Sequence, residues 1–155
     1  MKTAEEFKAF MGGEAGKLAD ALLVATAFAQ LERERVDGYV EPIFAAYGFR
    51  DGRTGEPLKH SRELYRVDDL QDDRVNEFYA ACDAAHRERG FTGPEGHCPA
   101  LVAENAVIQA ERALLEAAGR WLGFDAGLVY GENRKKMLDL LLGANAIKYR
   151  KGKRA

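Results

Sequence analysis

Four ionisable side chains fall on helix faces that are otherwise apolar: Glu32, His86, Glu104 and Glu111. Glu104 and Glu111 are seven residues apart, so on one helix they lie on the same face, two turns apart. The polar residues of that helix, among them Arg112 and Glu116, gather on a separate narrow arc. We therefore predict that Glu104 and Glu111 are largely buried and that Arg112 and Glu116 are exposed.

These four side chains suggest metal chemistry. An ionised carboxylate in a dry interior is costly unless its charge is compensated, and a divalent ion or a di-metal centre compensates several carboxylates at once. In this hypothesis the glutamates supply oxygen ligands and His86 supplies an imidazole, with Tyr39 and Tyr79 as hydrogen-bond donors around them. The predicted ligands of the divalent metal ion are Glu32, His86, Glu104 and Glu111.

Two other compensations stay open. An arginine from a neighbouring helix can pair with a buried glutamate, or the apolar face can be a homodimer interface with polar groups across it. The spacing does not match a known carboxylate bundle, because neither Glu104 nor Glu111 is followed three residues later by the histidine that di-iron bundles use. The alternative hypothesis is therefore a non-catalytic, homodimeric interaction protein whose inward glutamates are ion-paired.

Cysteine and histidine form a second pattern. Cys82 and His86 are one helical turn apart, and His97 and Cys98 are adjacent, which gives a Cys₂His₂ set for zinc but without the usual spacing of paired cysteines. Cys98 also precedes Pro99 at a predicted helix N-terminus, where a thiol becomes more nucleophilic. The alternatives are a core cysteine at 82 and a helix-entry turn at 96–99.

The elements that must position these residues are helices. Alanine, leucine, glutamate and arginine dominate, and long β-branched runs are missing. Thr3 and Glu6 form a capping-box pattern before a short helix, which the pair Gly12-Gly13 ends. Further helices are predicted over 14–47, 72–89, 99–122 and 133–148. The helix over 14–47 is expected to kink or to restart at Gly38 and Pro42.

The sequence thus predicts an all-α protein, a helical bundle of about five helices with a short hairpin or ordered loop between residues 48 and 69. Residues 1–147 are predicted to form a single helical domain. Residues 148–155 hold five basic residues and no acid, and we expect a frayed C-terminal tail there. Nucleic acid is not an expected partner apart from this basic tail, because the net charge of the chain is −2.

Composition excludes several classes of protein. The 155 residues suit one domain, and Ser61 is the only serine, outside any G-x-S-x-G pattern. No P-loop or dinucleotide-binding glycine motif is present. Two cysteines make no disulfide framework, the N-terminal residues do not resemble a signal peptide, and no stretch is long enough for a membrane span. We expect a cytoplasmic, self-associating protein without a membrane partner.

Overall fold

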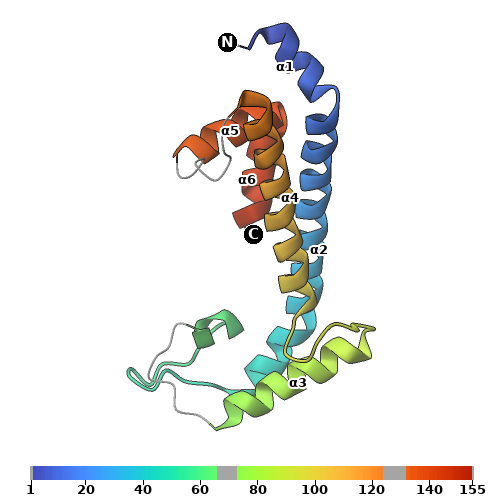
Figure 1. The fold of residues 1–155 in the computed structure, drawn as a ribbon. Coiled ribbons are helices and arrows are strands. Elements are labelled where there is room, and N and C mark those ends of the chain that lie inside the picture. Colours follow the sequence, from blue (N-terminus) through green and yellow to red (C-terminus); the bar gives the residue numbers. More distant parts are fainter. Residues whose placement is uncertain (1, 66–72, 124–131, 155) are drawn as a thin grey trace. The chain divides into compact units, whose positions relative to one another are not determined.

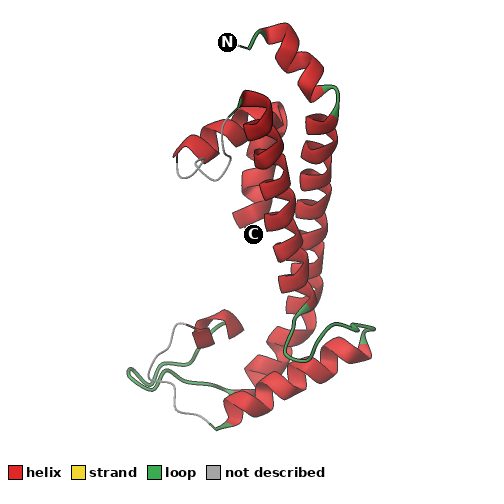
Figure 2. Ribbon diagram, in the orientation of Figure 1, coloured by secondary structure: helices red, strands yellow, loops and turns green. Residues whose placement is uncertain are grey.

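A computed structural model describes residues 2–65, 73–123 and 132–154 of the chain. The predicted all-α class is confirmed, and the described residues contain no strand (Figure 2). No helix among them is both long and apolar enough to cross a membrane. The helical elements, with η for 3₁₀ turns, are α1 Ala4–Met11, α2 Glu14–Tyr47, η1 Ser61–Tyr65, α3 Arg74–Glu88, α4 Pro99–Leu122, α5 Glu132–Leu142, η3 Gly143–Asn145 and α6 Ala146–Arg154 (Figure 1).

The N-terminal elements follow from local rules. The Thr3 side chain accepts from the backbone N–H of Glu6, and the Glu6 carboxylate accepts from the backbone N–H of Thr3, so the predicted capping box opens α1. Helix α2 neither restarts nor ends at Pro42. The proline cannot donate to the carbonyl four residues earlier, but Val40 and Phe44 on either side of it are buried in one core, which holds the helix together.

The C-terminal region differs from the sequence expectation. The single helix expected over 133–148 is divided into α5 and α6 by the turn η3, where Gly143 adopts a left-handed backbone with φ of 55°. Residues 146–154 form α6, and Tyr149 is only 3% exposed. The frayed tail expected over residues 148–155 therefore overlaps a helix whose Tyr149 side chain is packed, and fraying of this segment stays a prediction.

The chain divides into two compact units, and the single domain expected over 1–147 stays a prediction. Unit 1 comprises residues 1–31 and 103–155, and unit 2 comprises residues 32–102. In unit 1, α2 and α4 run antiparallel (Figure 1), and Phe10 before α2 stacks on Trp121 at the end of α4 with ring centroids 4.4 Å apart. Small residues form much of the unit 1 core, which lets the helices approach closely: Ala15, Ala19, Ala29, Ala103 and Ala118.

Unit 2 has a separate, more aromatic core. Phe44, Phe49 and Phe78 lie within 5.7 Å of one another between ring centroids, and Val36, Val40 and Cys82 are buried with them.

The predicted ordered loop begins as a tight turn. Arg50 and Pro57 form an isolated antiparallel bridge, and the backbone N–H of Leu58 donates to the carbonyl of Phe49. The segment continues into η1, and residues 66–69 of the predicted loop lie outside the described residues.

Candidate functional site

Glu111 is buried, as predicted, and is fully paired within unit 1. It is 7% exposed. Arg134 from α5 donates from Nε at 2.8 Å and also from its terminal nitrogen to one carboxylate oxygen, and the Tyr149 hydroxyl from α6 donates to the other. The cation that compensates this carboxylate is therefore an arginine from a neighbouring helix, one of the alternatives that the sequence left open.

The other predictions on α4 are confirmed in part. Arg112 and Glu116 are exposed. Glu104 is half-buried rather than largely buried. The prediction that both glutamates are largely buried is therefore confirmed only for Glu111.

The remaining two predicted ligands have protein partners in unit 2. Glu32 accepts two hydrogen bonds from the guanidinium of Arg35, at 3.0 and 3.1 Å. His86 is 4% exposed, and its Nδ1 lies 2.6 Å from the hydroxyl of Tyr39. In the described part of the chain, no three His, Cys, Asp or Glu side chains are placed to hold one metal ion. The Cys₂His₂ alternative, whose residues all belong to unit 2, therefore has no such cluster behind it. Glu32 and His86 belong to unit 2 and Glu104 and Glu111 to unit 1, so the four-ligand metal site stays a prediction.

The structure instead reveals a cavity of about 690 Å³ whose lining residues all belong to unit 2. Apolar side chains make up much of its wall, from α2, α3 and the start of α4: Val36, Val40, Phe78 and Leu101. His86 lines the cavity together with Cys82, His97 and Cys98. The cysteines and histidines of the second sequence pattern thus line one hollow, and none of the three predicted glutamate ligands is among its lining residues.

His86 is oriented by contacts on several sides. Its ring meets the Tyr39 ring edge-on with centroids 5.5 Å apart and the Phe91 ring at 6.2 Å. The guanidinium of Arg89 lies 3.9 Å from the centroid of the Tyr39 ring, so the phenol is itself held. Burial lowers the pKa of His86, and burial raises the pKa of Tyr39. The phenol therefore keeps its proton and the imidazole is neutral near pH 7.

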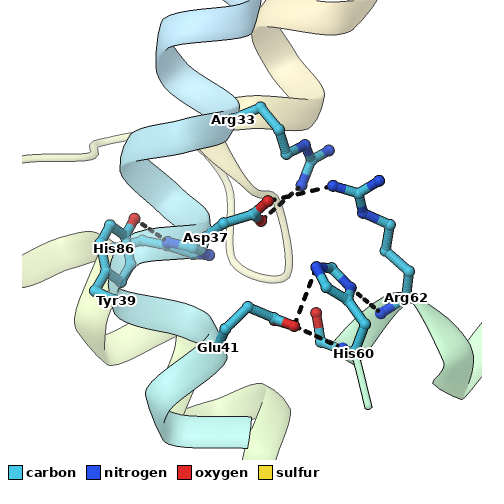
Figure 3. Close-up of polar contacts among 8 residues, drawn as sticks. Arg33, Asp37, Tyr39, Glu41, His60, Arg62 and His86 are labelled. Atoms are coloured by element: carbon cyan, nitrogen blue, oxygen red, sulfur yellow. Dashed lines mark hydrogen bonds and ion pairs between the residues drawn. The ribbon is translucent and has the colours of Figure 1, made fainter. Parts of the chain in front are cut away.

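The edge of the cavity carries a network of charges (Figure 3). Asp37 on α2 lies 3.8 Å from Arg33 on the same helix and 3.2 Å from Arg62 in η1. One oxygen of Glu41 accepts from the backbone N–H of Ser61 at 2.8 Å. These contacts tie η1, which supplies Ser61 and Arg62 to the cavity wall, to two successive turns of α2.

His60 completes this attachment. Its Nδ1 accepts from the backbone N–H of Arg62 at 3.1 Å, and its Nε2 lies 3.2 Å from the same oxygen of Glu41 (Figure 3). Because Nδ1 is an acceptor here, a neutral ring carries its proton on Nε2, the nitrogen beside the Glu41 carboxylate. The second oxygen of Glu41 is buried without a hydrogen-bond partner, the only such side-chain atom in the described residues.

Both cysteines are free thiols. Cys82 is buried, and desolvation with the nearby Cys98 and Glu41 raises its thiol pKa to about 11. A thiol with such a pKa is a weak nucleophile at neutral pH, which agrees with the interpretation of Cys82 as a core residue. Cys98 is half-buried, and its carbonyl accepts from the backbone N–H of Val102 in the first turn of α4.

Sequence reasoning missed the residues that decide these sites. Arg134 and Tyr149 gave no signal, because both stand in a strongly basic part of the sequence where charge alone suggests solvent exposure. Tyr39 was expected to donate to a ligand residue, and it does contact His86. The cavity itself depends on how four segments meet, which periodicity does not encode.

Comparison of the chain with protein-family models, with curated proteins and with solved structures found no match.

Proposed function

We propose that unit 2 binds a small, largely apolar molecule in its cavity. One observation carries this proposal, namely a hollow of about 690 Å³ with an apolar wall and a few polar groups that converge on it. Ligand pockets in proteins typically measure about 300–1,000 Å³ and combine apolar walls with a small number of placed polar groups. The buried, oriented His86 in the wall supports a binding role, since fully buried histidines in cores usually have both ring nitrogens satisfied.

The neutral fluorophore 1-N-phenylnaphthylamine tests this proposal, because its emission rises when it enters an apolar site. We expect saturable binding of one molecule per chain. Leu101 lines the cavity but is 52% exposed, so Leu101→Trp fills the hollow without replacing a core residue. This variant should bind the fluorophore at least about tenfold more weakly, which corresponds to about 1.4 kcal/mol.

The matched control is Leu140→Trp, since Leu140 is a 57% exposed leucine of unit 1. It should bind like the unaltered protein. A fluorophore that does not bind the unaltered protein, or that binds both variants equally, would contradict the proposal.

Self-association has an observation of its own and remains the second candidate. Val24, Phe28 and Leu31 follow one another at four and three residues along α2 and are 70%, 56% and 65% exposed. They lie opposite the buried seam through Leu22, Thr26 and Ala29, so α2 is apolar on two sides in unit 1. The three-four spacing is that of a seam between two helices, which a second copy of the same stripe would cover.

Light scattering at micromolar concentration tests this second candidate. We expect a mass above the 17.2 kDa of one chain, and Phe28→Glu should return it to that value. Leu140→Glu, which places the same charge at an exposed leucine outside the stripe, should leave the mass unchanged. A 17.2 kDa species of the unaltered protein across a tenfold dilution would exclude the homodimer.

Metal binding through Glu32, His86, Glu104 and Glu111 and a cytoplasmic location stay predictions. Elemental analysis of the purified protein, with thermal melting in the presence and absence of a chelator, tests the first of them. A bound metal ion and a chelator-sensitive melt would support it, and their absence would leave the ion pairs of Glu32 and Glu111 as the compensation for their charge. Fractionation of cells that produce the protein tests the second.

A further inference from the structure

We infer that His86 selects the ligand of this cavity by donating a hydrogen bond from its Nε2–H to an acceptor oxygen of an uncharged molecule. This inference rests on the proposed binding function and names the class of ligand: an apolar ketone, ester or ether. It follows from three properties of the structure, which are the tautomer of His86, the free position of its Nε2 and the charge balance around the cavity.

The contact with Tyr39 sets the tautomer. The hydroxyl of Tyr39 and Nδ1 of His86 are 2.6 Å apart, and among the described residues that hydroxyl has no other acceptor for its proton. Donation from the phenol to Nδ1 uses this proton and leaves Nδ1 as an acceptor. A neutral imidazole then carries its own proton on Nε2. His86 thus presents a donor to its surroundings rather than a base.

The Nε2 position has no protein partner in the described residues. No hydrogen bond or ion pair of the described chain uses this nitrogen, yet it is not among the fully buried side-chain atoms that lack a partner. His86 is 4% exposed and lines the cavity. The small accessible part of its ring therefore faces the hollow, and a ligand oxygen there would satisfy a donor that the fold leaves open.

The charges around the cavity favour an uncharged ligand. Arg33 and Arg62 contribute two positive charges and Asp37 and Asp83 two negative charges to the lining. Asp37 is paired with both arginines, and Asp83 lies 3.6 Å from Arg87. A carboxylate ligand would meet the two aspartates and an organic cation would meet the two arginines, so neither gains a net attraction. An apolar body with one acceptor oxygen meets no such penalty.

The tautomer is measured first, without any ligand. Long-range ¹H–¹⁵N correlation spectra of the full chain at pH 7.5 separate protonated from unprotonated imidazole nitrogens. We expect His86 to show a protonated Nε2 and an unprotonated Nδ1. In Tyr39→Phe the donor to Nδ1 is gone, so the two tautomers should mix and the two nitrogen shifts should converge. A protonated Nδ1 in the unaltered protein would overturn the inference.

Ligand selection is measured with two neutral naphthalene probes of similar size. Prodan carries a ketone oxygen, and 1-N-phenylnaphthylamine carries none. In His86→Phe the donor is lost but the ring is kept, so prodan should bind about tenfold more weakly while the affinity for the other probe changes less than about twofold. His86→Gln keeps an N–H donor near the position of Nε2 and should retain most of the prodan affinity.

The outcomes separate this inference from the proposed function. If neither probe binds the unaltered protein, the cavity is not a ligand site and both proposals fail. If both probes bind and His86→Phe weakens neither, or weakens both equally, the binding function stands and the role of His86 is excluded. Should His86→Phe fail to fold, the comparison of His86→Gln with Tyr39→Phe decides, since only the latter should lose the preference for prodan.

Discussion

Glu111 in unit 1 and His86 in unit 2 are both buried polar side chains on apolar helix faces, but their polar atoms have different surroundings. Both carboxylate oxygens of Glu111 accept hydrogen bonds, from Arg134 and from Tyr149. Among the described residues, only one ring nitrogen of His86 has a partner, the hydroxyl of Tyr39, and the residue lines a cavity. The same sequence pattern, a polar residue on an apolar helix face, therefore marks a hydrogen-bonded carboxylate in unit 1. In unit 2 it marks an imidazole with one nitrogen that has no partner among the described residues.

This difference shows what the pattern can and cannot indicate. A polar residue on an apolar face has to be compensated, and sequence alone does not say whether protein or ligand does so. Glu111 itself belongs to α4, and α5 and α6 supply Arg134 and Tyr149, so removal of either partner should cost stability. For His86 the described residues supply a partner to one of the two ring nitrogens, so substitutions there should alter ligand binding more than stability.

The largest expected effect is at Arg134. Arg134→Met removes the guanidinium that pairs with the buried carboxylate of Glu111, and the loss of one partner typically costs 3–5 kcal/mol for a fully buried pair. Because the Arg134 side chain is 35% exposed, water can replace part of the contact. We expect a loss of about 2–4 kcal/mol in the free energy of unfolding, measured by urea denaturation at pH 7.

Arg112→Met is the matched control, since Arg112 is an exposed arginine beside Glu111 in sequence. It should change the free energy of unfolding by less than about 0.5 kcal/mol. Equal effects of the two variants would show that Glu111 does not depend on its buried partner.

The second effect concerns the hydroxyl of Tyr149. Tyr149→Phe keeps the buried ring and removes one donor to a charged carboxylate, and hydrogen bonds to charged groups contribute about 1.5–3 kcal/mol. Burial and the bond to Glu111 also raise the pKa of Tyr149, so its proton is present throughout the working pH range. We expect a loss of about 2 kcal/mol in the urea experiment.

Tyr47→Phe serves as the control for the loss of a hydroxyl. Its ring stacks on Phe49 at 5.5 Å, and within the described chain its hydroxyl makes no hydrogen bond. A stability change of Tyr47→Phe as large as that of Tyr149→Phe would mean that the carboxylate contact contributes little.

A smaller effect is expected at Tyr39, the counterpart of Tyr149 in unit 2. Tyr39→Phe removes a hydrogen bond between neutral groups, which contributes about 0.5–1.5 kcal/mol. The free energy of unfolding should therefore fall less than for Tyr149→Phe under the same conditions. A larger loss would indicate that the contact between Tyr39 and His86 mainly stabilises the fold, as the contacts of Glu111 do.

The elements with local signals could be predicted from the sequence. The capping box at Thr3 places the start of α1, and Pro99 marks the first residue of α4. The position of Glu111 within the apolar arc correctly indicates its burial. These features depend on residues within a few turns of one another, which is the range over which helical periodicity operates.

The remaining features depend on contacts between distant segments. Glu111 and Arg134 are 23 residues apart, and Tyr39 and His86 are 47 apart, so their pairing follows from how helices dock. The division of α5 from α6 follows from one positive φ at Gly143, a residue that a helix also tolerates. Partners of buried groups and the cavity are therefore properties of tertiary packing.

The smallest expected effect is the pH dependence that His86 adds to stability. Burial, with the positive charges of Arg35, Arg89 and Arg87, lowers the pKa of His86 in the folded state below its ordinary value of 6.5, although Asp83 opposes this. As the pH falls through 6.5, the unfolded chain therefore binds a proton at this residue before the folded chain does, and acid favours unfolding. The contribution of His86 should be constant above about pH 7.5 and decline on acidification, with a slope of at most about 1.4 kcal/mol per pH unit for one proton.

Urea unfolding at pH 8, 7, 6 and 5.5 measures it as the difference between the unaltered protein and His86→Gln, in which His60 and His97 are still present. Parallel curves for the two proteins would show that His86 has the same pKa in the folded and the unfolded chain. His86 would then behave as a solvated imidazole and not as the buried, oriented donor that the cavity requires.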